Sequence, residues 1–145
     1  ITESLLMYRV SRYDIKGKAY LQLQEKYYLA DLGLRYYLLG QRNVDQGHIL
    51  ENVVYLELLR RGYRVYVGKV GNAEVDFVAQ DQEGDLSYYQ VAWTVREAAT
   101  LERELRPLDS IADHYPKYLL TMDLDPPISH NGIRQEYALD WLLGA

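Results

Sequence analysis

A helix-like segment followed by three strand-like runs constrains the fold of this chain more than any other feature. Residues 43–61 carry apolar side chains at the i, i+3, i+4 spacing of a helix, and Gly62 follows as a stop signal. Three runs rich in β-forming residues come next, at 63–69, 74–80 and 86–93. Only short turns separate these runs. Because short turns join antiparallel neighbours, we expect the three strands to form an antiparallel meander.

The second half of the chain adds a helix and a further strand. Residues 94–110 return to a helical pattern, with Thr94 as the expected N-cap. Residues 118–122 form a short apolar run that is typical of a buried strand, and residues 133–143 fit either a last strand or a helical turn. The predicted order is therefore helix, three strands, helix, strand. This order predicts the α/β class, with a mixed sheet flanked by helices on both faces.

The first thirty residues differ in pattern from the rest. Residues 1–10 resemble the end of a helix, and those that follow mix polar and apolar side chains around a glycine. We therefore expect residues 1–30 to form a connector from an upstream domain and residues 31–145 to form the domain itself, beginning with a short helix at 32–39. The chain starts at Ile1 inside an apolar segment, so we expect it to be part of a longer protein.

The composition excludes several classes of protein. The 145 residues suffice for one domain of ordinary size and include no cysteine, which rules out disulfides and thiolate metal sites. A chain without cysteine fits a reducing, cytoplasmic compartment. No stretch is apolar over the roughly 20 residues that a membrane-spanning helix needs. We therefore expect no membrane partner.

The charge balance bears on nucleic-acid binding. The chain has 16 basic and 21 acidic residues, and the resulting net charge of -5 counts against tight autonomous binding to DNA. A local cluster of Arg60, Arg61 and Arg64 is the candidate for contacts with a nucleic-acid backbone. The alternative is that these arginines form a solvated helix end and strand edge.

Three polar residues are the candidates for a functional site. Glu51 lies in the first turns of the helix predicted at 43–61, Asp76 in the second strand of the meander and Gln90 in the third. Counting outward from the intervening turn puts Asp76 and Gln90 at a similar height, and a helix packed on that face brings Glu51 to the same place. Carboxylate and carboxamide oxygens suit Mg²⁺. The alternatives are a solvent-facing strand acid for Asp76 and an acid that favours the helix dipole for Glu51.

The residues around these positions resemble a known family. The resemblance is carried by GHILENVVYLELLRRGYRVYVGKVGNAEVDFVAQ, YYQVAW, KYYLADLGLR and PKYLLTMD, and it covers about residues 5–143. These runs are similar to the C-terminal domain of uncharacterised prokaryotic AAA-type ATPases. That family is similar in pattern to the PD-(D/E)XK, restriction-endonuclease-like superfamily, whose core order is αβββαβ. The resemblance implies that Glu51 is the superfamily's acidic helix residue, Asp76 its strand aspartate and Gln90 the start of its (D/E)xK motif.

The (D/E)xK motif departs from the superfamily's pattern in two ways. Gln90 stands at the position of the acid, where its amide oxygen can still ligate a metal. Ala92 stands where the superfamily has a lysine that orients the attacking water or steadies developing charge, and the loss of one such group costs ~10²–10³ in rate. Lys69, at the end of the first strand, is a candidate replacement. No GxxxxGK[ST] loop occurs, so we expect no ATPase activity from this chain and an ATPase domain upstream of it.

Three hypotheses for function follow. The first is a degenerate nuclease-like domain that serves as a DNA-binding or partner-binding module of an AAA-type ATPase. The second is an active Mg²⁺-dependent endonuclease or resolvase, in which Glu51, Asp76 and Gln90, with the main-chain carbonyl of Val91, hold the ion. The third is a structural domain that forms oligomers through its tyrosine-rich strand edges.

Overall fold

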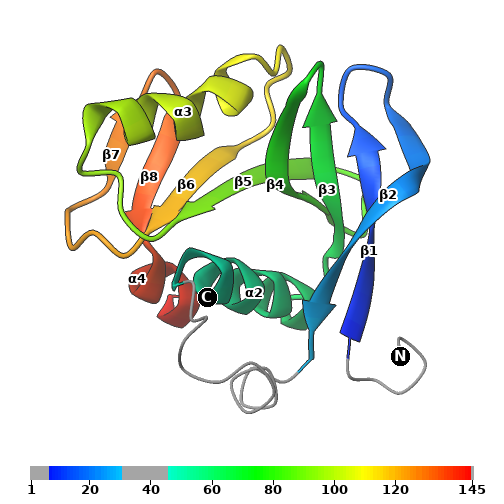
Figure 1. Cartoon of the computed structure of the whole chain (residues 1–145), viewed down its shortest axis with the longest axis horizontal. Coiled ribbons are helices and arrows are strands. Elements are labelled where there is room, and N and C mark those ends of the chain that lie inside the picture. Colours follow the sequence, from blue (N-terminus) through cyan, green and yellow to red (C-terminus); the bar gives the residue numbers. More distant parts are fainter. Residues whose placement is uncertain (1–6, 31–45, 145) are drawn as a thin grey trace.

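The fold is an α/β arrangement built on one mixed sheet. The structure, a computed structural model, describes residues 7–30 and 46–144, apart from the side chains of residues 22–24. The strands are β1 (Met7–Asp14), β2 (Ala19–Leu29), β3 (Arg64–Val70), β4 (Ala73–Gln80), β5 (Leu86–Ala92), β6 (Lys117–Thr121), β7 (Ile128–His130) and β8 (Ile133–Tyr137). The described helices are α2 (Gln46–Arg60), α3 (Ala98–Asp109) and α4 (Ala138–Leu143). The strands follow the order β2-β1-β3-β4-β5-β6-β8-β7 across the sheet (Figure 1).

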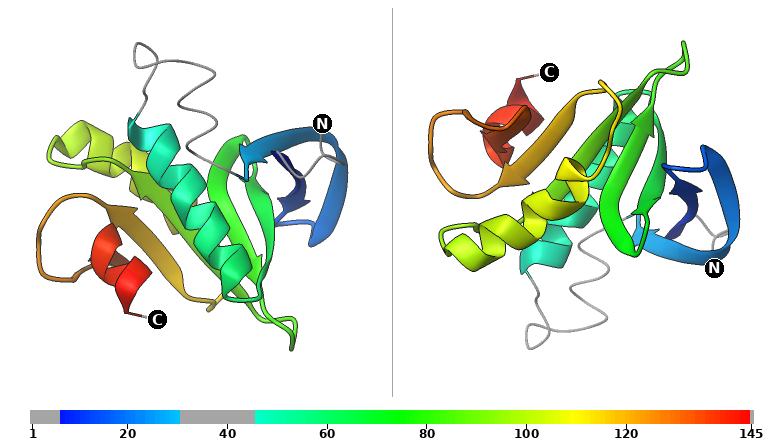
Figure 2. Two further views of the ribbon diagram at one scale, coloured as in Figure 1. Left: turned by 90° about the horizontal axis from the view of Figure 1, so that it is seen from below. Right: turned by 90° about the horizontal axis from the view of Figure 1, so that it is seen from above.

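Helices cover both faces of the sheet, as expected from the sequence. Helices α2 and α4 lie on one face and α3 lies on the other (Figure 2). Each face has its own apolar cluster. Val54 and Leu58 of α2 pack with Phe77 and Tyr89 on the first face, while Leu108 of α3 belongs to the cluster on the second face. In each cluster, the apolar side of a helix packs on the apolar side chains of one face of the sheet.

The central elements confirm the order predicted from the sequence. Strands β3, β4 and β5 form the expected antiparallel meander. Helix α3 then crosses over the sheet and returns the chain to β6, which runs parallel to β5. Parallel neighbours need a crossover of this kind, because a tight turn cannot join them. The last segment contains both structures that its pattern allowed, with β8 followed by α4.

The beginning of the chain differs from the prediction. Residues 7–10 were expected to end a helix, and they lie instead in β1. Strand β1 pairs with β2 in antiparallel fashion and with β3 in parallel fashion, so it lies inside the sheet. Pairing with strands distant in the sequence overrides the local pattern here. The residues predicted as a connector thus supply two strands to the main sheet, while the short helix expected at 32–39 lies outside the described residues.

The expected cap of the second helix is also different. Helix α3 begins at Ala98, with Glu97 at the N-cap position and no side-chain cap. The Thr94 hydroxyl donates instead to the Asp123 carboxylate, at 2.6 Å. Asp123 is buried and also accepts the Val95 N–H at 2.8 Å. A buried carboxylate that needs donors therefore competes successfully for Thr94.

None of the described helices is long and apolar enough to span a bilayer.

The C-terminal end of α2 is held by a cluster of charges. The Glu57 carboxylate accepts hydrogen bonds from Arg60 at 2.6 and 2.8 Å and from Arg61 at 3.0 Å. Arg61 also donates to the Trp141 carbonyl at 2.6 Å, and its guanidinium lies 4.1 Å from the centre of the Trp141 ring. The hydrogen bond from Arg60 is the largest cause that lowers the pKa of Glu57 to about 2. This cluster ties α2 to α4.

Replacing Glu57 tests that cluster. We expect Glu57→Gln to reduce the free energy of unfolding at pH 7 by about 1 kcal/mol, because it weakens the three charge-assisted hydrogen bonds from Arg60 and Arg61. The pKa of Glu57 is depressed in the folded state, so its contribution is complete above the ordinary value of 4.5 and is lost as pH falls toward 2. Urea unfolding of both proteins from pH 7 to pH 2 measures this. A difference that stays constant across that range would contradict the assignment.

Candidate functional site

A β-bulge in β4 aims the Asp76 side chain toward α2. Tyr66 pairs with Val78 and Gly68 pairs with Val75, so Asp76 and Phe77 together lie opposite the single residue between Tyr66 and Gly68. A bulge of this kind places an extra residue in one strand and changes where its side chain points. The bulge explains why Asp76 interrupts the simple alternation of its strand.

The sheet forks at Asp76. The ladder between β4 and β5 runs as far as the pair Phe77–Tyr89 and then stops. Beyond that pair, the Asp76 N–H donates to the Gln90 side-chain oxygen at 2.8 Å, and the Val91 N–H donates to the Asp76 carboxylate at 2.8 Å. Two side chains thus replace main-chain hydrogen bonds where the strands part, and the N–H groups of Asp76 and Val91 both have an acceptor there.

Gln90 connects the fork to the opposite face of the sheet. Its side-chain nitrogen lies 3.2 Å from the main-chain oxygen of Glu104 in α3 and 3.3 Å from a carboxylate oxygen of the same residue. Gln90 is buried, and its oxygen already accepts the Asp76 N–H. Gln90 therefore lies beside Asp76, as the sequence predicted, but its carboxamide spans from the fork to α3.

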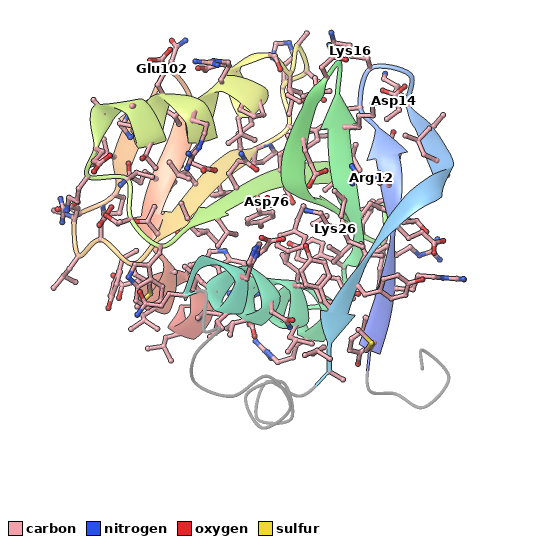
Figure 3. The ribbon with its side chains drawn as sticks, viewed as in Figure 1. Arg12, Asp14, Lys16, Lys26, Asp76 and Glu102 are labelled. Carbon is pink, nitrogen blue, oxygen red and sulfur yellow. The ribbon has the colours of Figure 1, made fainter. Side chains whose placement is uncertain are left out.

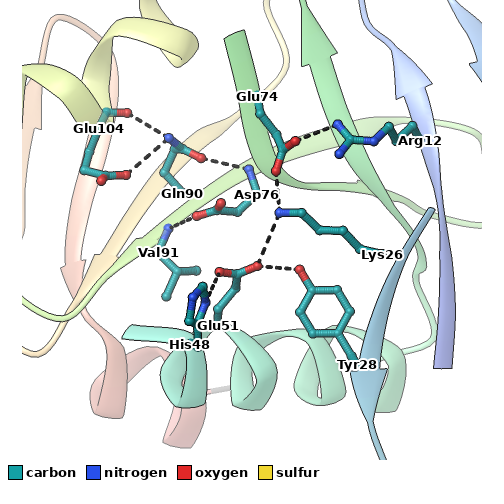
Figure 4. A network of polar contacts seen from close by, with 10 residues as sticks. All are labelled: Arg12, Lys26, Tyr28, His48, Glu51, Glu74, Asp76, Gln90, Val91 and Glu104. Carbon is teal, nitrogen blue, oxygen red and sulfur yellow. Dashed lines mark hydrogen bonds and ion pairs between the residues drawn. The ribbon is translucent and has the colours of Figure 1, made fainter. Parts of the chain in front are cut away.

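Glu51 reaches the same point from α2. Its carboxylate accepts a hydrogen bond from the Tyr28 hydroxyl and lies 3.7 Å from His48 Nδ1. Figure 4 shows the Glu51 and Asp76 carboxylates facing each other across the space between helix and sheet. Burial, and after it the negative charge of Glu51, raises the pKa of Asp76 well above its ordinary value. Glu51 and Asp76 are thus brought together as predicted.

Lys26 of β2 is the residue of this site that the sequence analysis missed. Its ammonium contacts the Glu74 carboxylate and lies 3.8 Å from Glu51 Oε1. Glu74 in turn accepts a hydrogen bond from Arg12 at 2.6 Å. Burial alone would lower the pKa of Lys26, but the hydrogen bond to Glu74 and the charges of Glu51 and Asp76 raise it overall. The spacing of Lys26 and Tyr28, two apart in a strand, was the available signal.

Lys69 and the arginines lie elsewhere. Lys69 is exposed at the end of β3, where its Cα pairs with that of Glu74, and it is absent from the network of Figure 4. Arg60 and Arg61 lie nine and ten residues beyond Glu51, roughly 14 Å along the axis at ~1.5 Å per residue. Arg64 is exposed at the start of β3. Their contact with a nucleic-acid backbone stays a prediction.

The carboxylates fit a hydrated divalent cation. Mg²⁺ usually takes only one or two protein carboxylates and keeps several waters. Glu51 and Asp76 supply such a pair from two rigid elements, a helix and a strand, and their carboxylates face each other in Figure 4. Within residues 7–30 and 46–144, no group of three or more histidine or acidic side chains is placed to hold a metal. Gln90 as a third ligand would have to use the lone pair that Asp76 leaves free.

One curated relative bears on the identity of this chain. The chain is 38% identical over 143 residues to an uncharacterised protein of Haemophilus influenzae, and the match covers 99% of this chain. The chain spans only 35% of that relative's length. No family model and no solved structure matches the chain. The comparisons therefore show a longer relative and assign no activity.

Replacing Asp76 tests whether the two carboxylates repel each other. Asparagine can still accept the Val91 N–H, and it removes the charge that faces Glu51. In buffer that contains EDTA at pH 7, we expect Asp76→Asn to raise the free energy of unfolding by about 1 kcal/mol. Urea unfolding measures the change, and Glu83→Gln in an exposed turn serves as the control. A loss of stability in Asp76→Asn would mean that the carboxylate is a structural group.

Proposed function

We propose that this chain is a restriction-endonuclease-like domain that hydrolyses phosphodiester bonds of nucleic acid with a divalent cation, as an endonuclease or resolvase. The observation that carries the proposal is the convergence of Glu51 and Asp76 at the fork of the sheet. Two carboxylates that face each other on a helix and a strand bulge are costly to the fold. Such costs are typical of functional sites.

The order of the elements supports the proposal. Helix α2, strands β3 to β5, helix α3 and strand β6 follow each other in the αβββαβ order of the PD-(D/E)XK core. The superfamily's acidic helix residue corresponds to Glu51 and its strand aspartate to Asp76. Both carboxylates reach the same point in space (Figure 4).

Ala92, which stands at the lysine position of the (D/E)xK motif, lies on a face of the sheet away from the two carboxylates. Ala92 packs with the apolar cluster under α3, on the face of the sheet opposite to Glu51. Residues 88–92 of β5 are paired with β6. This pairing fixes the register of the strand, and so it fixes the face of the sheet on which each side chain of β5 lies. The identity of residue 92 therefore says little about which charges surround Glu51 and Asp76.

The chain's own residues prepare the site for a cation. Tyr28 donates to the Glu51 carboxylate, and the Val91 N–H donates to the Asp76 carboxylate, so both ligands are oriented. When bound, a divalent ion supplies a more acidic water and neutralises charge at the phosphate. Lys26 adds a positive charge to the site, with its ammonium 3.8 Å from Glu51 Oε1.

We place the domain in a larger AAA-type ATPase. The support is the resemblance of its sequence motifs to the C-terminal domain of such proteins. The relative in Haemophilus influenzae is long enough for a further domain, because this chain covers 35% of it. The ATPase part of the same protein is then the natural partner of this domain.

A second candidate is a nuclease-like module that binds DNA or a protein without cleavage. It is favoured by Gln90, whose carboxamide is engaged by both Asp76 and Glu104 instead of being free for a metal. The Arg12–Glu74–Lys26 chain also gives Glu51 a cation from within the protein. In this candidate, the network is a stable recognition surface.

Cleavage assays separate these candidates. The protein is incubated with supercoiled, linear and branched DNA in Mg²⁺ or Mn²⁺, beside Asp76→Asn and Glu51→Gln. We expect metal-dependent cleavage that falls at least ~10²-fold in either variant, since each replaces a charged carboxylate ligand with a neutral amide. Glu102→Gln, on the exposed side of α3, is the matched control. Salt-dependent DNA retention without cleavage would favour the second candidate, and no retention at any salt would favour the oligomerisation domain.

A lysine at position 92 gives an independent test. Ala92→Lys introduces a charge into the cluster under α3, so we expect it to destabilise the fold by about 1–3 kcal/mol. We also expect no gain in cleavage rate, because the side chain lies on the other face of the sheet. Urea unfolding and cleavage rates are measured together. A tenfold or greater gain in rate would contradict this placement of residue 92.

A further inference from the structure

We infer that Lys26 is the positively charged residue that contacts the phosphate at the Glu51–Asp76 site. The inference rests on the proposed function. It assigns to β2, a strand outside the segment that carries Glu51, Asp76 and Gln90, the charge that Ala92 cannot supply. The residue lies 66 positions before Ala92 in the sequence, so the spacing of the (D/E)xK motif does not point to it.

The position of Lys26 is fixed by its strand. The main chain of Leu29 exchanges two hydrogen bonds with the buried Asn52 side chain of α2, at 3.0 and 3.1 Å. Tyr28 stacks on Tyr55 of α2, with ring centres 4.6 Å apart. These contacts hold β2 against the helix that carries Glu51. The main chain at Lys26 is therefore anchored beside the site.

The side chain of Lys26 is directed into the site. Lys26 pairs with Val10, a core residue, so it lies on the inner face of the β1–β2 hairpin. Figure 3 places Lys26 and Asp76 in the interior between the sheet and α2, whereas Lys16 lies at the periphery. Glu74 holds the ammonium on one side and Glu51 lies 3.8 Å away on the other. The charge is thus held between two carboxylates.

An ammonium has three donors and no acceptor, so Lys26 acts as a charge and a hydrogen-bond donor. In hydrolysis, the water oxygen forms a bond to phosphorus while the bond to the leaving oxygen breaks. One proton passes from the water to solvent, and the leaving oxygen takes a proton from solvent. Lys26 exchanges no proton in this step. Its role is to donate to a non-bridging phosphate oxygen, where negative charge develops.

Glu74 acts as a positioning residue for Lys26. It is shared between Lys26 and Arg12, which joins it from β1 at 2.6 Å. Arg12 neutralises part of the negative charge of Glu74. Glu74 therefore holds Lys26 in place while it neutralises only part of the positive charge of Lys26. Glu74→Gln is therefore expected to lower cleavage less than the loss of Lys26 does.

The test compares lysines at three positions. Lys26→Met and Lys26→Arg are measured beside Lys69→Met, at the position suggested by the sequence, and Lys16→Met in an exposed turn as the matched control. Cleavage of DNA is measured in saturating Mg²⁺. Binding of a short DNA duplex is measured in Ca²⁺ by fluorescence anisotropy across a salt series. Unfolding in urea confirms that each variant is folded.

We expect Lys26→Met to lower cleavage by ~10²–10³ and Lys26→Arg to recover part of that loss. In Ca²⁺, Lys26→Met should weaken DNA binding and reduce the slope of log affinity against log salt by about one, as for a lost phosphate contact. Lys16→Met should change neither quantity. If Lys26→Met does not fold, the Lys26→Arg and Lys26→Gln variants carry the same comparison.

The outcomes separate this inference from the proposed function. If the protein cleaves DNA and Lys26→Met cleaves within threefold of it, the inference is overturned and the proposed function stands. If the protein binds DNA without cleaving it, cleavage fails as the function, and a reduced salt slope in Lys26→Met still supports the phosphate contact. An unchanged slope, a loss confined to Lys69→Met, or no DNA binding by the unaltered protein overturns the inference.

Discussion

The hydrogen bond from the Val91 N–H to the Asp76 carboxylate joins the two halves of the sheet where their strands part. Strand β4 stays with β3, and β5 leaves it to run beside β6. Without a replacement, the separation would leave main-chain donors open in the interior. The side chains of Asp76 and Gln90 are that replacement. One carboxylate oxygen of Asp76 is thus committed to the fold, and the carboxyl group is fixed in place facing Glu51.

The charges around the fork form one network across several elements. Glu51, Glu74 and Asp76 supply carboxylates from α2 and β4, and Lys26 and Arg12 supply cations from the hairpin of β1 and β2 (Figure 4). Within the described part of the chain, no buried polar side-chain atom lacks a partner. Asp76 is the residue whose charge is least compensated, because Lys26 lies between Glu51 and Glu74. A protein keeps such a group where the charge has a use, since stability alone would favour its removal.

The sequence pattern predicted part of the candidate site. Glu51 and Asp76 could be predicted, because helix position and strand order place them at one height of the sheet. Gln90 could be placed beside Asp76 for the same reason, yet its contact with Glu104 depends on how α3 packs. Lys69, the lysine that the sequence suggested, lies outside the network of Figure 4, and Lys26, the lysine that we propose, lies within it. The region that holds Lys26 has weak periodicity, and its strands exist because β1 pairs with β3 from a distant part of the sequence.

The sequence by itself determined the class of the fold, the meander of β3, β4 and β5, and the helices that flank them. Those features depend on local periodicity and short turns, which are properties of neighbouring residues. The tertiary structure alone decided that β1 and β2 join the sheet, that a bulge turns Asp76 toward Glu51, and that Lys26 reaches both Glu51 and Glu74. Each of these depends on strand pairing or packing between segments far apart in the chain. Such contacts depend on the register of paired strands and on the burial of charge. Both are set by several segments at once, so no single segment predicts them.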